Sequence, residues 1–398
     1  MDTQRPRLAT AVMFFVSGAV IGVWAANVPF VRDRLDASTT TLGLCLLAMA
    51  AGSVLTMPLA GRELQRRPSR AMTRLGALLV PPAAVLPLLA STVWQLALAL
   101  FLFGCCVGLI DVSMNAHGVA VERAMGTAVM SSLHAGWSFG GLAGAGATAV
   151  GHALGADPRA TAAVFMVVLL VLGLVAGPRM GEMSAADAAA SGDPAAGAPA
   201  SAGAPAAAGA GAGARGRVRP SRAVVVIGAL VFALFMCEGA LTDWSALYLD
   251  RDLGTSASLA AIGYGAFAGG MACGRTFGDA LKRRVGGVTL LRFGALTASV
   301  AVAAMLLVGA PGFALVALLL AGLGAANGVP LLFSAAGHAR DMDAGPAIAA
   351  VSAAGYFGLL AGPPLLGFVA DATTLPWALA IVALLTAVVA ANARRAEG

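Results

Sequence analysis

The chain has 398 residues, of which 59% are hydrophobic and only 11% are charged, and its mean hydropathy is +0.86. Soluble proteins carry about 25% charged residues, so this composition excludes a soluble globular domain and predicts a protein that lies in a lipid bilayer. The net charge of +6 does not indicate nucleic-acid binding, because the basic residues lie in short loops between apolar stretches.

Apolar stretches close to the ~20 residues that a helix needs to cross the hydrocarbon core recur along the chain. The first, residues 8–31, follows Arg5 and Arg7 like the hydrophobic part of a signal peptide, but it is too long for one and further spans follow. We therefore predict an all-α membrane protein with twelve transmembrane helices. The predicted spans are 8–30, 39–60, 75–91, 94–115, 127–150, 160–178, 223–248, 258–277, 293–309, 313–334, 345–369 and 376–393.

The basic residues predict the orientation of these spans. With a cytoplasmic N-terminus, 21 of the 25 Lys and Arg residues lie on the cytoplasmic side, as the positive-inside rule requires. The four on the other side are Arg32, Arg34, Arg159 and Arg251. We expect a multi-pass protein of the inner (cytoplasmic) membrane with both termini in the cytoplasm.

One segment breaks the pattern of spans. Residues 181–220 contain the run GDPAAGAPASAGAPAAAGAGAGARG, which has no hydrophobic period and no large apolar side chain. Such Ala/Gly/Pro-rich sequence is typical of a flexible linker. We predict an N-terminal six-helix bundle over 1–180, a cytoplasmic linker over 181–220 and a C-terminal six-helix bundle over 221–398.

The two predicted bundles are related by an internal repeat. Three segments of the first half match segments of the second half, in the same order, at a nearly constant offset. The pairs are 61–67 with 278–284, 108–111 with 324–327, and 138–144 with 356–362. Parallel repeats of this kind predict two pseudo-symmetric bundles with a binding site between them near mid-membrane.

Several motifs resemble the major facilitator superfamily, in particular its fucose-permease-related branch. They are GLIDVSMN at 108–115, VER at 121–123, EGALTDW at 238–244 and the basic loops of the repeat. Within that branch the chain is most similar to the YbjJ-type inner-membrane proteins. The resemblance implies the major facilitator fold and secondary transport of a small organic solute, with no cofactor. The first span departs from the branch, since it lacks the acidic residue that fucose permeases carry there.

Three acidic residues, Asp111, Glu238 and Asp243, fall inside predicted spans, whereas no Lys or Arg is predicted deep within any span. A charge at mid-bilayer is costly, so each acid requires a reason. Burial without a cation favours the protonated form. These acids therefore predict a proton-coupled carrier.

Asp111 shares a helical stripe with Gly104, Gly108 and Asn115. The family resemblance implies that Asp111 takes part in proton coupling; the alternative is an acid that is hydrogen-bonded to nearby backbone. His134 lies at a similar depth in the next span. It could form a titratable pair with Asp111 or be satisfied by a backbone carbonyl.

Glu238 shares a stripe with Thr242 and Ser245, and Asp243 lies roughly 140° round the same helix. We therefore expect that the two acids do not both face one cavity squarely. Glu238 is the predicted proton or ligand site. Asp243 is predicted to be an extracellular gate residue or an interfacial acid.

Other polar and aromatic residues are candidates for substrate binding and gating. The predicted substrate contacts are Trp24, Asn27, Asn115, Asn327 and Tyr356. Aromatic residues near helix ends can instead be interfacial anchors. The resemblance implies a cytoplasmic gate at Arg275 and Asp279, and the alternative is that such basic loops interact with anionic lipid.

The remaining sequence features exclude other function classes. The five cysteines lie within apolar spans without metal-ligand spacing. No Walker A motif, HExxH or nucleophile elbow is present, so we expect no enzyme, no metal and no cofactor. Proton-driven efflux of a drug or secondary metabolite is the main alternative to uptake. A non-transporting sensor or scaffold, and an intramembrane enzyme built on Asp111 and His134, are the alternatives of other classes. We expect a monomer in the bilayer whose partners are a small-molecule substrate and protons.

Overall fold

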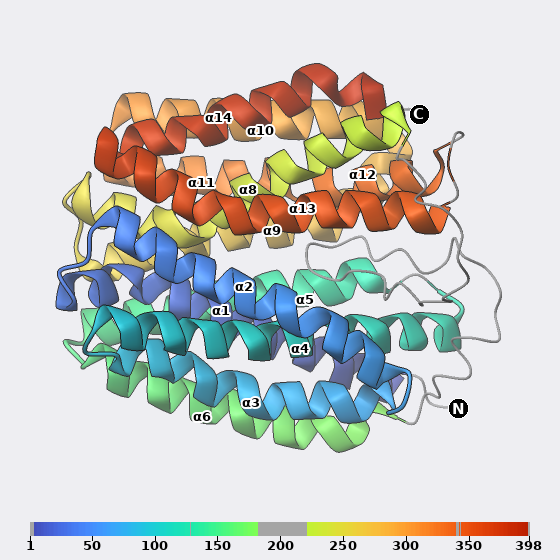
Figure 1. Ribbon diagram of the computed structural model, residues 1–398, viewed down its shortest axis with the longest axis horizontal. Coiled ribbons are helices and arrows are strands. Elements are labelled where there is room, and N and C mark those ends of the chain that lie inside the picture. Colours follow the sequence, from blue (N-terminus) through green and yellow to red (C-terminus); the bar gives the residue numbers. More distant parts are fainter. Residues whose placement is uncertain (1–3, 128, 182–220, 340–341, 343, 397–398) are drawn as a thin grey trace.

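The computed structural model describes residues 4–127, 129–181, 221–339, 342 and 344–396, and within them it contains helices and short connections (Figure 1). The first half comprises α1 (Gln4–Arg34), α2 (Thr39–Leu64), α3 (Ser69–Leu89), α4 (Val93–Met125), α5 (Met130–Ala153), α6 (Pro158–Ala176) and the short helix η1 (Gly177–Met180). The second half comprises α8 (Arg222–Arg251), α9 (Ala257–Val285), α10 (Gly287–Val308), α11 (Pro311–Ala325), α12 (Gly328–Gly337), α13 (Ala344–Ala372), α14 (Leu375–Asn392) and η3 (Ala393–Ala396). The predicted linker lies outside the described residues except for Gly181.

The all-α membrane fold predicted from the sequence is confirmed. Among the described residues, 11 helical stretches are long and apolar enough to cross a membrane, with α11 and α12 counted together as one stretch. Helix α5 has 24 residues and a similar length, but its glycine, serine and histidine residues lower its hydropathy. With α5 included, the described part of the chain forms twelve transmembrane helices.

Small polar residues fix where many helices begin. An N-cap side chain accepts a hydrogen bond from one of the free backbone N–H groups of the first turn. Ser38, Thr92, Ser221 and Ser256 do this for α2, α4, α8 and α9. Asp157 caps α6 by accepting from the N–H groups of Arg159 and Ala160. A side-chain hydrogen bond from Arg159 is the main interaction that holds the pKa of Asp157 below its ordinary value.

Several helices continue well beyond the predicted apolar spans. Helix α9 was predicted over 258–277 but extends to Val285, and Lys282, Arg283 and Arg284 lie in its last turn. Basic side chains stabilise a helix C-terminus by their interaction with the helix dipole, so the helix does not end where the apolar residues end. Arg275 therefore lies inside α9 and away from its C-terminal end.

The predicted span 313–334 is divided into α11 and α12. The division falls at Ala326 and Asn327, where the Asn327 side chain donates a hydrogen bond to the backbone oxygen of Gly274 on α9 at 3.1 Å. An asparagine side chain that bonds to backbone competes with helix hydrogen bonding. Hydropathy alone cannot detect such a break, because both segments are apolar.

The two halves pack their helices in the same way. In the first half α1 packs against α5, α2 against α4, and α3 against α6; in the second half the equivalent pairs are α8 with α13, α9 with α11, and α10 with α14. The halves meet along two seams, where α5 lies against α9 and α2 against α13. The pseudo-twofold axis that relates the halves maps one seam onto the other, as expected for two copies of one six-helix unit.

Glycines allow the helices within a bundle to approach closely. A Cβ atom placed on Gly140 of α5 would lie 2.1 Å from the backbone oxygen of Phe15 on α1, and one placed on Gly22 would lie 2.2 Å from that of Gly141. Small residues at such contacts allow close van der Waals packing between membrane helices. The glycines of α5 therefore hold it against α1.

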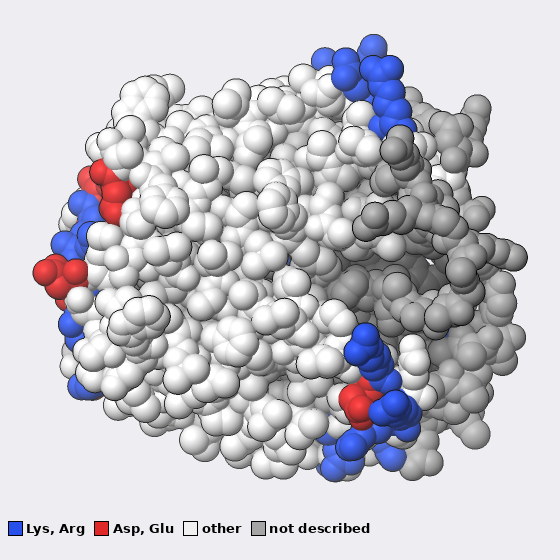
Figure 2. Space-filling view, in the orientation of Figure 1, with Lys and Arg blue, Asp and Glu red and all other residues white. Residues whose placement is uncertain are grey.

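Charged residues lie at the two ends of the molecule. Figure 2 shows an uncharged band between an end where Lys and Arg predominate and an end that carries both signs. Helix α1 starts and α14 finishes at the basic end (Figure 1). We call the opposite end, which contains the α1–α2 and α8–α9 loops, the distal end.

Replacing Gly140 by alanine is expected to destabilise the protein by about 1–3 kcal/mol, because the added methyl group would overlap the α1 backbone. The measurement is the thermal unfolding midpoint in detergent. Gly146 on the same helix has no other atoms within 4 Å of a built Cβ, so Gly146→Ala is the matched control. Equal midpoints for the two variants would contradict the close packing of α1 and α5.

Candidate functional site

A cavity of about 180 Å³ lies between the two halves. Its wall is formed by α1, α2, α4 and α5 from the first half and by α8, α9 and α13 from the second. Much of this wall is apolar and includes Met49, Met57 and Met114. The ionisable residues in the wall are Asp111, His134, Glu238, Asp243, Arg275 and Tyr356. An apolar pocket with a few convergent polar groups is the usual form of a small-molecule site.

Asp111 of α4 lies in the cavity wall with 9% of its surface exposed. Its Oδ1 accepts a hydrogen bond from the side-chain amide of Asn115 at 3.2 Å. Its Oδ2 has no hydrogen-bond partner among the described residues, although it is buried. Since Asn115 also donates to the backbone oxygen of Asp111, it supports the carboxylate from one helical turn away.

His134 of α5 lines the same cavity. The ring of Phe14 meets the imidazole edge-on, with centroids 4.8 Å apart, and the His134 Nε2 has no hydrogen-bond partner among the described residues. The structure therefore brings His134 and Asp111 to one cavity. Among the described residues, the side chains of His134 and Asp111 are not hydrogen-bonded to each other, and no backbone carbonyl is bonded to the His134 Nε2.

The prediction that no basic residue lies deep within a span is wrong. Arg275 of α9 is only 7% exposed and lines the cavity, with its guanidinium 3.4 Å from Oε1 of Glu238. It also donates to the hydroxyl of Ser138 at 2.9 Å and lies 6.0 Å from the centre of the Trp137 ring. Glu238 therefore has an ion-pair partner. The prediction assigned Arg275 to the cytoplasmic end of its span, whereas α9 continues past it to Val285 and packs against α5 of the other half.

Asp243 also lines the cavity, together with Glu238. The two acids of α8 therefore share one cavity although they lie on different sides of the helix. An angle of about 140° separates two positions on an isolated helix, but α8 has neighbours from both halves, α1 as well as α9 and α13. The cavity wraps around α8 far enough to reach both side chains.

The predicted substrate residues divide into two groups. Trp24 and Tyr356 line the cavity. The side-chain amides of the three asparagines instead donate hydrogen bonds to backbone oxygens. Asn27 donates to Val23, Asn115 to Asp111, and Asn327 to Gly274. These three asparagines are not among the residues that line the cavity. The side chain of Asp279 lies outside the described residues.

Sequence reasoning missed the part of Arg275 in the cavity and the capping role of Glu122. The Glu122 carboxylate accepts hydrogen bonds from the backbone N–H groups of Val129 and Met130 at 2.7 and 2.9 Å, at the start of α5. No sequence signal marks an acid that caps the next helix across a short loop.

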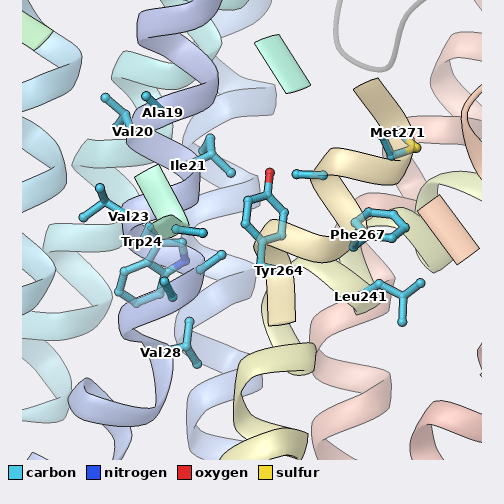
Figure 3. Close-up of a cluster of buried hydrophobic side chains, with 14 of the residues drawn as sticks. Ala19, Val20, Ile21, Val23, Trp24, Val28, Leu241, Tyr264, Phe267 and Met271 are labelled. Atoms are coloured by element: carbon cyan, nitrogen blue, oxygen red, sulfur yellow. The ribbon is translucent and has the colours of Figure 1, made fainter. Parts of the chain in front are cut away.

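An apolar core joins the two halves beside the cavity. In Figure 3, Trp24 on α1 and Tyr264 on α9 face each other, with Ile21, Val28 and Phe267 around them. Trp24 and Tyr264 are each 1% exposed. This core lies between α1 of the first half and α9 of the second, and its residues Ile21 and Trp24 also line the cavity.

Polar contacts close the distal end between the two halves. Asp371 of α13 accepts hydrogen bonds from the backbone N–H groups of Thr39 and Thr40 at 3.1 and 2.8 Å, and from the Thr39 hydroxyl. Asp33 pairs with Arg251, and the Ser258 hydroxyl donates to the backbone oxygen of Ala149 at 2.9 Å. An acid of one half thus caps the first turn of α2 in the other half.

Two helical bundles related by a pseudo-twofold axis, with a central cavity closed at one end, define a polytopic membrane carrier. The family model of the Major Facilitator Superfamily matches residues 10–342. The chain belongs to this superfamily.

Curated relatives and solved structures agree with this assignment. An uncharacterised MFS-type transporter of Yersinia pestis is 35% identical over 388 residues, which cover 98% of this chain and 95% of the relative. The membrane protein MosC of Rhizobium meliloti is 32% identical, with 96% and 88% covered. The xylose transporter XylE of E. coli, solved in a partially occluded inward open conformation, has a TM-score of 0.68 at 14% identity, with 98% and 96% covered. A bacterial homologue of the lysosomal transporter Spinster has a TM-score of 0.69 at 15% identity, with the same coverage.

Replacing Glu238 by glutamine is expected to destabilise the protein by about 3 kcal/mol, because it leaves the Arg275 guanidinium buried without a counter-charge. Glu238→Gln combined with Arg275→Met should recover part of the loss, since both charges are then absent. Thermal unfolding in detergent measures both effects. Glu63→Gln, which breaks exposed pairs with Arg66 and Arg67, is the control and should change little. A Glu238→Gln variant as stable as the wild type would refute the stabilising role of the Glu238–Arg275 pair.

Replacing Asp371 by alanine is expected to favour opening of the distal end. Loss of a helix cap costs about 1 kcal/mol, which corresponds to about a fivefold shift of the equilibrium. A membrane-impermeant maleimide, applied from the distal side, should label an Ile21→Cys reporter faster in a background without native cysteines.

Asp157→Ala provides the control for this experiment, because Asp157 caps α6 within one half. It removes a similar cap without touching the contact between halves. If both alanine variants change the labelling rate equally, Asp371 does not act as a distal latch.

Proposed function

We propose that this protein is a proton-coupled secondary transporter that moves a small organic solute across the cytoplasmic membrane by alternating access. The observation that carries the proposal is the state of Asp111. It is a buried acid in the wall of a cavity between two bundles, and its Oδ2 has no hydrogen-bond partner among the described residues.

Asp111 is suited to carry the proton because burial without a cation favours the neutral form. When the cavity opens to water, solvation stabilises the ionised form, and the acid releases its proton on that side. Glu238 differs from Asp111 because the Arg275 guanidinium lies 3.4 Å from it. Because the Glu238 carboxylate already has a cationic partner, Glu238 is the weaker candidate for the coupling proton.

Arg275 has a second part in the proposal, since it connects the halves. It belongs to α9 of the second half and donates to Ser138 of α5 in the first half, and its backbone oxygen accepts from the Ser131 hydroxyl at 3.0 Å. Movement of one bundle against the other breaks these contacts. Arg275 therefore acts as a gate residue beside the site, with His134 close to it.

The proposed orientation places the termini in the cytoplasm and the distal end outside. The predominance of Lys and Arg at the end that bears the termini supports this orientation under the positive-inside rule. The distal contacts of Asp371 and Asp33 then form the extracellular gate. In this orientation the gate is closed to the outside in the described conformation.

Membership of the fucose-permease-related branch is part of the proposal and rests on the motif at 108–115 and the segment at 238–244. Both segments contribute acids to the cavity, Asp111 from the first and Glu238 and Asp243 from the second. Export is the second candidate direction, favoured by the methionine-rich wall of the cavity, because flexible methionines accommodate varied apolar compounds.

Replacing Asp111 by asparagine is expected to abolish solute accumulation driven by a proton gradient and to leave exchange of solute at equilibrium. The experiment screens radiolabelled small solutes in proteoliposomes, with and without an imposed pH difference, in wild type and variant. Asp157→Asn, outside the cavity, is the control and should behave as the wild type. An Asp111→Asn variant that still concentrates solute with an unchanged dependence on pH would refute the proton role of Asp111. The sign of the flux decides between uptake and export.

A further inference from the structure

The charges in the cavity wall do not balance. Among the described residues that line it are three carboxylates, one guanidinium and the imidazole of His134. Glu238 and Arg275 neutralise each other as an ion pair. Asp111 and Asp243 remain, and neither has an ion pair among the described residues. When Asp243 is ionised, the wall therefore carries an excess of negative charge even if Asp111 holds a proton, and a cation bound beside Asp243 favours that ionised form.

The same wall contains polar atoms that are buried but not hydrogen-bonded. Trp24 Nε1, His134 Nε2, Asp111 Oδ2 and the Tyr356 hydroxyl have no partner among the described residues. Their residues are 1%, 6%, 9% and 9% exposed, respectively. Buried polar side-chain atoms in proteins are nearly always hydrogen-bonded, so these four atoms, on residues that line one cavity, are candidates for hydrogen bonds to a ligand.

We infer that the transported solute is an organic monocation, a compact molecule with a protonated amine that binds Asp243 and with an oxygen acceptor that binds the Trp24 N–H. This inference rests on the proposed transport function and adds the charge class of the substrate. The indole N–H is only a donor, whereas a carboxylate is only an acceptor. The wall thus requires a solute with both an acceptor and a cationic donor.

Anionic and neutral solutes fit the wall less well. An anion would meet two uncompensated carboxylates and would have to displace Glu238 from Arg275. A neutral solute would leave Asp243 without a counter-charge, and uncompensated charge in a membrane interior is costly. Trp24 and Tyr356 add aromatic surface to the wall, and aromatic faces attract organic cations.

The charge class also agrees with the proposed coupling. With a proton on Asp111, the cation on Asp243 and the Glu238–Arg275 pair, the loaded cavity has no net charge. Without the solute the same cavity keeps the charge of Asp243. Reorientation of the bundles is therefore less costly with the loaded cavity, because no uncompensated charge crosses the membrane.

Thermal stabilisation of the purified full-length protein in detergent tests the inference with probes that match in shape and differ in charge. One set is glucosamine, glucose and glucuronate; the other is cyclohexylamine, cyclohexanol and cyclohexanecarboxylate. In at least one set, the amine is expected to raise the unfolding midpoint. Its neutral and anionic analogues are expected to leave the midpoint unchanged. Equal shifts within both sets, a larger shift with an anion, or no shift with either amine would overturn the inference.

Variants of Asp243 test where the amine binds. Asp243→Asn should weaken amine binding at least about tenfold, the loss expected for one charged hydrogen bond, and Asp243→Glu should retain the preference for the amine. Asp252→Asn, an exposed acid just after α8, is the control with unchanged binding. Unchanged amine binding in a folded Asp243→Asn variant would overturn the assignment.

The binding experiment is independent of transport. If an amine binds but proteoliposomes never move it, the proposed function fails and the inferred charge class stands. If a neutral solute is moved with a proton gradient and no amine binds, the inferred charge class fails and the proposed function stands.

Discussion

An ionisable side chain inside a membrane protein must face a cavity or a partner, and this constraint organises the molecule. Three acids and one arginine lie within the transmembrane bundle, at depths where exposure to lipid would be strongly unfavourable. The protein places them all on one internal surface between its two halves. Glu238 and Arg275 pair with each other, whereas Asp111 and Asp243 are left for a proton and a solute in the proposed function.

Two seams make the most extensive contacts between the halves in the described part of the chain. Helices α5 with α9 and α2 with α13 form the contacts, and these are equivalent positions in the repeat. At the distal end the seams are strengthened by the Asp371 cap on α2 and by the Asp33–Arg251 pair. Such contacts are local and polar, so they can open without disrupting the apolar packing within each bundle. Glycine-mediated packing keeps each bundle rigid, and rigid bundles suit a rocking movement.

The fold was predictable because it depends on properties that the sequence displays directly. Length of apolar stretches, their number, the repeat and the placement of basic residues need no knowledge of side-chain contacts. Three of the candidate site residues, Asp111, Trp24 and Tyr356, line the cavity. For Asp111, the stripe that it shares with Gly104 and Gly108 was the signal for a face that turns inward. Asn327 was expected from the symmetry of the repeat and failed, since its amide bonds to the backbone of α9 at the α11–α12 break.

The sequence by itself determined that this chain is a two-fold repeated helical membrane protein with a few acids inside its spans. This follows because hydrophobic length and composition act on each segment separately. Only the tertiary structure decided that Arg275 neutralises Glu238, that Asp243 shares the cavity, and that Asp371 closes the distal end. Each of these features depends on which helices lie next to one another, and that is decided by how the bundles pack.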